Sequence, residues 1–234
     1  MNYINKKTTK NTMNVGLAEL YGALIGDGCI SDYFSKQRNR YYSCWLITGH
    51  THDEFYFRDV LQPILLKIFG IKGNINYRKN YNAVLLRVYN TKIIDYFKNQ
   101  GFPVGKKGQI TIPKIILNNE KFSIACVRGI FDTDGSVYPR YSKKYSSHKR
   151  KYDYINIEFK MNSNPIIWSV KSVLELNGIK CSKIRYNKKS SVVCVYDQKS
   201  VHRFFSIIKP SNQYHVERYL SLKKLQNISG GSMA

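Results

Sequence analysis

The sequence has few acidic residues, no long apolar run and no paired cysteines. Asp and Glu number 15 against 38 Lys and Arg, which gives 234 residues a net charge of +23. No stretch approaches the roughly 18 apolar residues of a membrane-spanning helix, and the polar N-terminus lacks the apolar core of a signal peptide. The five cysteines form no Cys-x-x-Cys pair, which argues against a disulfide framework and a thiolate zinc site. We therefore expect an intracellular protein in a reducing compartment, cytoplasm, nucleoid or organelle matrix.

The excess of positive charge indicates the kind of partner. Solubility alone does not require so large an excess of one sign, whereas a polyanion such as nucleic acid is attracted by it. A protein of the membrane surface would need an amphipathic basic helix, and the sequence shows no convincing example. We therefore expect a nucleic-acid partner and no membrane.

The chain repeats itself at about half its length. Three pairs of segments are separated by 107 or 108 residues, and three matches at one offset are not expected by chance. The pairs are Gly70-Ile71-Lys72 with Gly178-Ile179-Lys180, Val88-Tyr89-Asn90 with Val195-Tyr196-Asp197, and Asp27-Gly28 with Asp134-Gly135. The repeat predicts two halves, residues 13–100 and 120–225, joined by a linker at 101–119 that is rich in Gly, Pro and Lys. Residues 226–234 are expected to be a flexible tail.

Hydrophobic periodicity predicts the same element order in both halves. In the first half we expect helices at 17–25, 53–69 and 91–99, and strands at 42–48, 71–78 and 83–89. In the second half we expect helices at 122–132, 164–177 and 198–208, strands at 136–141, 153–161, 179–187 and 191–196, and a terminal helix at 211–225. The predicted fold class is α+β, with two pseudo-symmetric αββαββα halves.

The sharpest feature is a pair of similar helix ends, Gly22-Ala23-Leu24-Ile25-Gly26-Asp27-Gly28 and Gly129-Ile130-Phe131-Asp132-Thr133-Asp134-Gly135. Gly22 and Gly26 share one helix face, and Gly129 and Thr133 share the equivalent face, so two helices can approach closely there. The final glycines suit left-handed caps. If these faces meet, Asp27 and Asp134 lie side by side at helix C-termini, where like charges repel. A divalent cation relieves that repulsion. A single helix ending in Asp-Gly is usually only a cap, but two at the repeat offset favour a site.

These segments resemble the paired LAGLIDADG motifs of homing endonucleases, in the style associated with archaeal introns and inteins. The resemblance extends over the element order from about Val15 to Leu225. It implies two antiparallel sheets that form a saddle over double-stranded DNA, with paired motif helices at the centre. It also implies a monomer that homes an intron by cutting both strands across the minor groove of a long asymmetric target, leaving short 3′ overhangs.

The resemblance further implies the site residues and the cofactor. Asp27 and Asp134 would be catalytic and would bind Mg²⁺, assisted by the backbone carbonyls of Gly26 and Thr133. We expect Mn²⁺ to substitute for Mg²⁺, and Ca²⁺ to bind without cleavage. Metal bound there would polarise the scissile phosphate, activate a water and stabilise the leaving 3′ oxygen.

Basic or amide residues at strand ends commonly support the metals in such proteins, and here none is placed cleanly. His50, Lys160 and Asn162 are the residues predicted for this role. His50-Thr51-His52 also resembles a metal-binding spacing, but two histidines without further partners usually lie in a solvated loop.

Alternation along the strands predicts which residues face DNA, because successive side chains point to opposite faces. The apolar set should pack on helices, and the polar set should meet base edges and phosphates. Basic loops near 35–40 and 140–151 should reach outward along the groove. The residues predicted to bind DNA are Lys36, Arg38, Arg40, Asn74, Asn76, Arg78, Arg87, Arg140, Lys143, Lys144, Tyr154, Asn156, Glu158, Lys160, Arg185 and Lys188.

Two alternatives use the same fold without cutting DNA. An RNA-binding maturase would help its own intron to splice, and a non-catalytic regulator would bind DNA only. Both can lose a motif carboxylate, whereas Asp27 and Asp134 are both present, which favours the nuclease. An intein is disfavoured because flanking splicing segments with a terminal His-Asn are missing. No protein partner is inferred.

Overall fold

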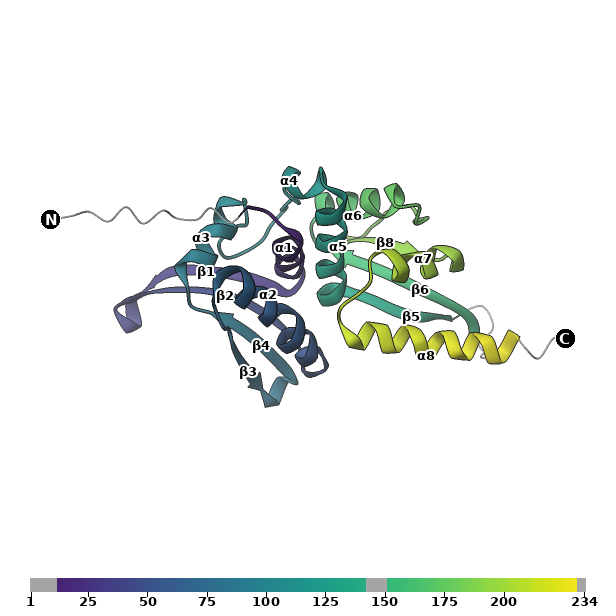
Figure 1. Cartoon of the computed structure of the whole chain (residues 1–234), viewed down its shortest axis with the longest axis horizontal. Helices are drawn as coiled ribbons and strands as arrows, with labels where there is room; N and C mark the ends of the chain where they lie inside the picture. Colours follow the sequence, from purple (N-terminus) through teal and green to yellow (C-terminus); the bar gives the residue numbers. More distant parts are fainter. Residues whose placement is uncertain (1–11, 142–150, 231–234) are drawn as a thin grey trace.

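The computed structural model describes residues 12–141 and 151–230, with side chains omitted at positions 38, 79, 141, 151–153 and 227–230. Figure 1 shows two αβ halves side by side, with two helices standing at their junction. The first half contains α1 (Val15–Asp27), β1 (Gly28–Ser35), η1 (Lys36–Arg38), β2 (Arg40–His50), η2 (Thr51–Asp53), η3 (Tyr56–Leu61), α2 (Gln62–Phe69), β3 (Asn74–Arg78), η4 (Lys79–Tyr81), β4 (Ala83–Val88) and α3 (Thr91–Asn99). The remainder contains α4 (Lys114–Leu117), α5 (Glu120–Asp134), β5 (Gly135–Tyr141), β6 (Lys151–Met161), α6 (Asn164–Leu176), β7 (Arg185–Tyr186), β8 (Ser191–Val195), α7 (Gln198–Ile207) and α8 (Gln213–Gly230).

Each half has one antiparallel four-stranded sheet, and the two sheets have equivalent strand orders. The orders are β1-β2-β4-β3 and β5-β6-β8-β7. One face of each sheet is apolar and packs on helices, as Trp45 and Ile47 of β2 and Ile157 and Phe159 of β6 show by their near-complete burial. The predicted α+β class with two equivalent halves is thereby confirmed.

The helices α1 and α5 are the axis of the molecule. Each begins at an asparagine whose side chain accepts a backbone hydrogen bond, Asn14 from Leu17 and Asn119 from Phe122, so both start at a good N-cap. The two helices lie next to each other at the centre of Figure 1, with one half of the molecule on each side of them. The predicted central helix pair is therefore present.

Glycine makes the approach of α1 and α5 possible. A Cβ on Gly22 would lie 2.0 Å from the Cys126 carbonyl oxygen, and one on Gly129 would lie 2.2 Å from that of Glu19. A Cβ on Gly26 would lie 2.0 Å from Thr133 Oγ1. The four small residues expected on the facing surfaces therefore do face one another, and backbone meets backbone between the helices.

The left-handed caps expected at Gly28 and Gly135 are wrong. Their φ angles are −99° and −84°, and both residues are extended because each helix passes directly into a strand. Glycine is required there for space instead: a Cβ would lie 2.6 Å from Leu24 Cα in the first case and 2.6 Å from the Phe131 carbonyl oxygen in the second.

Several element boundaries differ from the periodicity. The helix expected at 53–69 is interrupted, because Tyr56–Leu61 forms a π-helix between a short 3-10 turn and α2. The strand expected at 179–187 is reduced to Arg185–Tyr186, and that at 71–78 begins only at Asn74. The linker contains the short helix α4, and α8 continues to Gly230, so residues 226–230 are helical rather than part of a tail.

Candidate active site between the motif helices

Asp27 and Asp134 lie at the adjoining ends of α1 and α5. A Cβ on Gly26 would lie 3.3 Å from the Cβ of Asp134, so the carboxylate of one helix stands beside the last turn of the other. Both aspartates reach the surface, but the surrounding protein still removes much of their water. This loss of hydration, reinforced by the charge of Asp134, raises the pKa of Asp27 to about 7. Loss of hydration likewise raises the pKa of Asp134, against the opposing charge of Lys107.

A lysine from the linker completes this group. Lys107 Nζ donates hydrogen bonds to the carbonyl oxygens of Leu24 at 3.4 Å, Ile25 at 2.6 Å and Gly26. Burial lowers the pKa of Lys107, and the charges of Asp134 and Asp27 oppose that shift. A cation thus sits on the carbonyl end of α1, where the helix dipole is negative.

The linker is held in place from both sides. Gly105 N donates to the Ile30 carbonyl at 2.7 Å, which ties the linker to β1 beside the end of α1. Gln109 then bonds the second half, donating to the Asn162 carbonyl at 3.0 Å and accepting from Asn164 N at 3.1 Å. Lys107 lies between these two attachments. The Gly, Pro and Lys content of the linker did not indicate the role of this lysine. The only sequence signal is its position between Gly105 and Gly108.

Lys107 and Asp134 share one cavity. Its volume is about 920 Å³, and it opens between the linker, the end of β6 and the turn before β8. Other residues that line it include Gly26, Lys106, Lys160, Asn162, Lys188 and Lys189. Two of the three supporting residues expected from the sequence, Lys160 and Asn162, therefore line the same cavity as Asp134.

The third expected residue, His50, does not line this cavity. Its backbone N donates to Asp53 Oδ2 at 2.8 Å, and its ring lies 4.2 Å from that of His52. His52 in turn stacks on Tyr214 at 3.9 Å. Within the described ranges, no group of three or more His, Cys, Asp or Glu side chains is placed to hold a metal. Of this segment, His52 contacts the second half through Tyr214, and His50 bonds within the first half.

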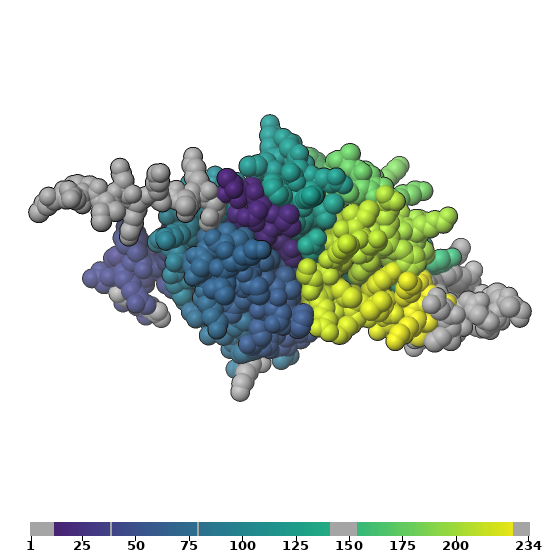
Figure 2. All heavy atoms as spheres, in the orientation of Figure 1, coloured from purple at the N-terminus to yellow at the C-terminus, as the bar shows by residue number. Residues whose placement is uncertain are grey.

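The segment before α8 reaches across to the first half at this point. The amide of Asn212 is buried and donates to Asp53 Oδ1 and to the Asp132 carbonyl, both at 2.8 Å. Ser211 N donates to Asp132 Oδ2 at 2.8 Å. In Figure 2 the yellow segment that contains these residues lies against the blue first half. Asp53 also adds negative charge near Asp27.

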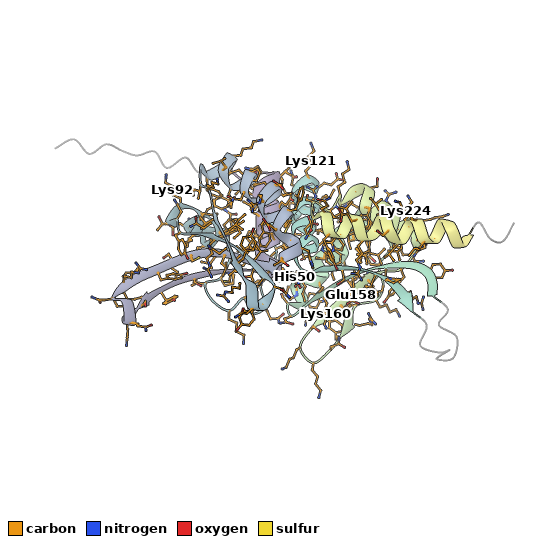
Figure 3. The ribbon with its side chains drawn as sticks, turned by 90° about the horizontal axis from the view of Figure 1, so that it is seen from below. His50, Lys92, Lys121, Glu158, Lys160 and Lys224 are labelled. Atoms are coloured by element: carbon orange, nitrogen blue, oxygen red, sulfur yellow. The ribbon has the colours of Figure 1, made fainter. Side chains whose placement is uncertain are left out.

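The polar faces of the sheets are arranged largely as the alternation predicts. In the first half, Asn74 and Asn76 pair with Arg87 and Leu85 across β3 and β4, on the face opposite Leu86, although Leu85 on their own face is also buried. Figure 3 shows Glu158 and Lys160 on the side of the sheets away from the helices, whereas Lys92, Lys121 and Lys224 lie on the helical side. The further exposed residues on predicted positions are Lys36, Arg40, Arg78, Arg140, Tyr154, Arg185 and Lys188.

Five of the residues predicted to bind DNA need comment. Asn156 is only 3% exposed, so its amide is covered by protein and is not presented to a ligand in this structure. Glu158 accepts a hydrogen bond from Tyr138 at 3.0 Å and lies 3.6 Å from Arg185. Lys143 and Lys144 fall outside the described residues, as does the side chain of Arg38.

Comparison with known proteins identifies this arrangement. Residues 121–209 match the family model described as a LAGLIDADG-like domain. I-DmoI in complex with DNA and Mn has a similar structure, with a TM-score of 0.59 and 21% identity over 83% of this chain and 97% of that one. The fold is that of LAGLIDADG homing endonucleases.

Two further structures of this fold extend over nearly the whole chain. The LAGLIDADG meganuclease I-CpaMI bound to uncleaved DNA has a TM-score of 0.61 and 14% identity, over 94% of this chain and 93% of that one. I-AabMI bound to uncleaved DNA has a TM-score of 0.62 and 13% identity, over 94% and 92%. No curated protein matches the sequence. In the part of the chain that is described, no helix has the length and apolarity needed to cross a membrane.

The residues present at the site fit a divalent cation of the Mg²⁺ type. Hard cations take oxygen ligands and commonly share them with substrate phosphates, so two carboxylates and helix-end carbonyls are a suitable partial set. The Lys107 ammonium already lies on the Gly26 carbonyl, so the end of α1 holds one positively charged group in this structure.

The C-terminal segment supplies a further pH-sensitive group, His215. His215 is buried against Phe131, its Nδ1 has no hydrogen bond within the described chain, and burial lowers its pKa from 6.5 to about 4. The unfolded chain therefore binds the extra proton first. Stability from neutral His215 is complete above pH 6.5 and is lost as the pH falls toward about 4, by about 3 kcal/mol in total.

Urea unfolding of wild type and His215→Gln at pH 7 and pH 4.5 measures this contribution. The free energy of unfolding should fall less on acidification in the variant, because glutamine cannot titrate. His202→Gln removes an imidazole from α7 and serves as the control, which should keep the wild-type pH dependence. Equal pH dependence in His215→Gln and wild type would contradict the assignment.

Proposed function

We propose that this protein is a site-specific endonuclease that cuts both strands of a long, asymmetric DNA target. The observation that carries the proposal is the pairing of Asp27 and Asp134 at the adjoining ends of α1 and α5, between two sheets with polar outer faces. The solved structures with this fold include complexes with DNA, some with Mn or Ca. An excess of 23 positive charges suits a polyanionic substrate.

We further propose the following roles for the individual residues of the site. Asp27 and Asp134, with the carbonyls of Gly26 and Thr133, would hold Mg²⁺, which supplies Lewis-acid activation of the phosphate and of a water. Lys107 would place its ammonium against the negative charge that develops on the reacting phosphate. One carboxylate from each half gives one cut in each strand, so one chain acts as a monomer across the minor groove and leaves short 3′ overhangs.

The sheets would provide recognition. Arg87, Asn74 and Asn76 on one sheet, and Arg185, Glu158 and Lys160 on the other, offer donors and acceptors of the kinds that pair with base edges. Lys188 and the basic loops would contact phosphates, which position the duplex without reading its sequence. Within this proposal, residues 13–100 and 120–225 each hold half of the target, and the linker at 101–119 contributes Lys107.

The proposal is tested by cleavage of a randomised duplex library in Mg²⁺, with the Asp27→Asn/Asp134→Asn double variant and an EDTA reaction as controls. We expect wild type to yield one long recovered site cut in both strands, and both controls to yield none. Mn²⁺ should replace Mg²⁺, and Ca²⁺ should permit binding without cutting. Tight duplex binding without cutting in any metal would instead indicate a regulator. Absence of both binding and cutting of DNA would favour an RNA-binding maturase.

A further inference from the structure

A cluster of aromatic side chains lies on the first sheet, made of Tyr33 on β1, Tyr42 on β2 and Tyr89 directly after β4. The ring centroids of Tyr33 and Tyr42 are 5.4 Å apart, and those of Tyr42 and Tyr89 are 5.8 Å apart with the rings edge to face. Tyr33 is 54% exposed and Tyr89 is 53% exposed. A contiguous group of exposed rings commonly marks a binding surface, because apolar area left in water is costly.

The cluster lies on the face of the sheet that points away from the helices. Tyr33 pairs with Tyr42 across β1 and β2, so their side chains share a face. Side chains alternate along a strand, which places Tyr42 opposite the buried Trp45, three positions further along β2. The equivalent face of the second sheet carries Glu158 and Lys160, on the side away from the helices in Figure 3. The three rings are therefore on the face assigned to DNA, although none was predicted from the sequence to bind it.

This face carries less charge in the first sheet than in the second. Strand pairing places the half-buried Leu46 of β2 at the position that Glu158 holds in β6. The repeat offset of 107 residues places Tyr33 at the position of Arg140. Where the second sheet has a carboxylate and a guanidinium, the first has an aliphatic chain and a ring. The two sheets therefore suit different features of a duplex.

Two of the three hydroxyl groups in the cluster are turned toward each other. Tyr42 OH donates to Tyr89 OH at 3.5 Å, so these hydroxyls are partly engaged within the protein. What the cluster offers to a ligand is then mainly ring surface. The apolar feature of the major groove is the C5-methyl group of thymine, whereas the other base-edge groups are hydrogen-bond donors and acceptors.

We propose that the first sheet reads its half of the target by packing Tyr33, Tyr42 and Tyr89 on thymine methyl groups in the major groove. The inference rests on the proposed function, in which this face meets duplex DNA. The tyrosines are specificity-determining residues, and the half of the target that they contact contains thymine at the contacted positions. The second sheet reads its half by hydrogen bonds instead, because charged side chains hold the corresponding positions.

Replacement of thymine by uracil tests this contact, because it removes the methyl group and keeps the base pair. A duplex is first selected for binding from a randomised library in Ca²⁺, and its thymines are then replaced in one half or in the other. Wild-type affinity should fall about fourfold for each methyl group lost from a ring contact. Replacement in the other half should leave the affinity nearly unchanged.

Variants of the exposed rings connect this loss to the cluster. In Tyr33→Ser/Tyr89→Ser, the loss of affinity caused by uracil should shrink by at least about fourfold, because the partners of the methyl groups are gone. Tyr33→Phe/Tyr89→Phe keeps both rings and should keep the wild-type loss. Tyr41→Ser is the matched control: Tyr41 is 78% exposed, precedes Tyr42 on β2 and points to the opposite face, so this variant should respond to uracil as wild type does.

The outcomes separate the inference from the function on which it rests. A selected duplex whose affinity does not respond to uracil would overturn methyl recognition and leave the nuclease intact. A uracil loss that is the same in wild type and in Tyr33→Ser/Tyr89→Ser would overturn the role of the cluster, as would a loss that disappears in Tyr41→Ser. A wild-type protein that neither binds nor cuts duplex DNA would overturn both.

Discussion

Asp27→Asn and Asp134→Asn should each lower the rate of double-strand cleavage by about 10³-fold or more. An amide keeps the shape of the carboxylate but removes the charge that attracts a divalent cation to the helix end. The partial negative charge of the helix terminus is too small to replace it. The measurement is conversion of a supercoiled plasmid that carries the target to linear DNA. Each variant should yield no linear product or accumulate the nicked circle.

Loss of folding would not explain this result. Loss of hydration, reinforced by the charge of Asp134, raises the pKa of Asp27 to about 7, so its charge disfavours the folded state at neutral pH and above. The melting temperature of Asp27→Asn in EDTA should equal or exceed that of wild type. Asp95→Asn, at an exposed position of α3, removes a carboxylate away from the site and should cut normally. Linear product at the wild-type rate from either motif variant would refute the assigned role.

Gly129→Ala should produce a large loss of stability for the addition of a single methyl group. The added Cβ would lie 2.2 Å from the Glu19 carbonyl oxygen and 2.7 Å from Ala23 N, so it meets backbone that cannot rotate away. The two helices must separate, which disturbs the packing of both halves at once. The expected cost exceeds about 3 kcal/mol, because overpacking against rigid atoms lies at or above the usual range. For a chain of this length, the melting temperature should fall by about 10 °C.

The control for this change lies in α1. An alanine at Gly16 would meet side-chain atoms and no backbone of a neighbouring helix: Ile64 Cγ2 at 2.9 Å, Ile68 Cδ1 at 3.1 Å and Asn14 Oδ1 at 3.4 Å. Gly16→Ala also improves helix propensity, so its melting temperature should stay near that of wild type. Thermal unfolding followed by circular dichroism compares the two variants. A loss below about 1 kcal/mol for Gly129→Ala would show that the helices separate more easily than their contacts indicate.

The sequence alone determined the parts of this protein that repeat or alternate. The offset of 107 residues between Asp27 and Asp134 predicted equivalent motif helices, and the small residues at Gly22, Gly26, Gly129 and Thr133 predicted their close contact. Alternation along β6 predicted which face is apolar, whereas in β3 Tyr77, predicted to pack on helices, is 47% exposed. These features are local or periodic, so each residue type is constrained by its near neighbours along the chain.

Tertiary structure alone decided which distant residues reach the motif helices. Lys107 and Asn212 lie 80 and 78 residues beyond the aspartates of their own halves, in segments without periodicity, and they reach the motif helices only because neighbouring contacts dock those segments. The extended backbone of Gly28 and Gly135 was likewise invisible, since a helix-ending glycine looks the same before a left-handed turn or a strand. Side-chain reach and backbone direction depend on packing between distant segments, and no pattern of near neighbours encodes them.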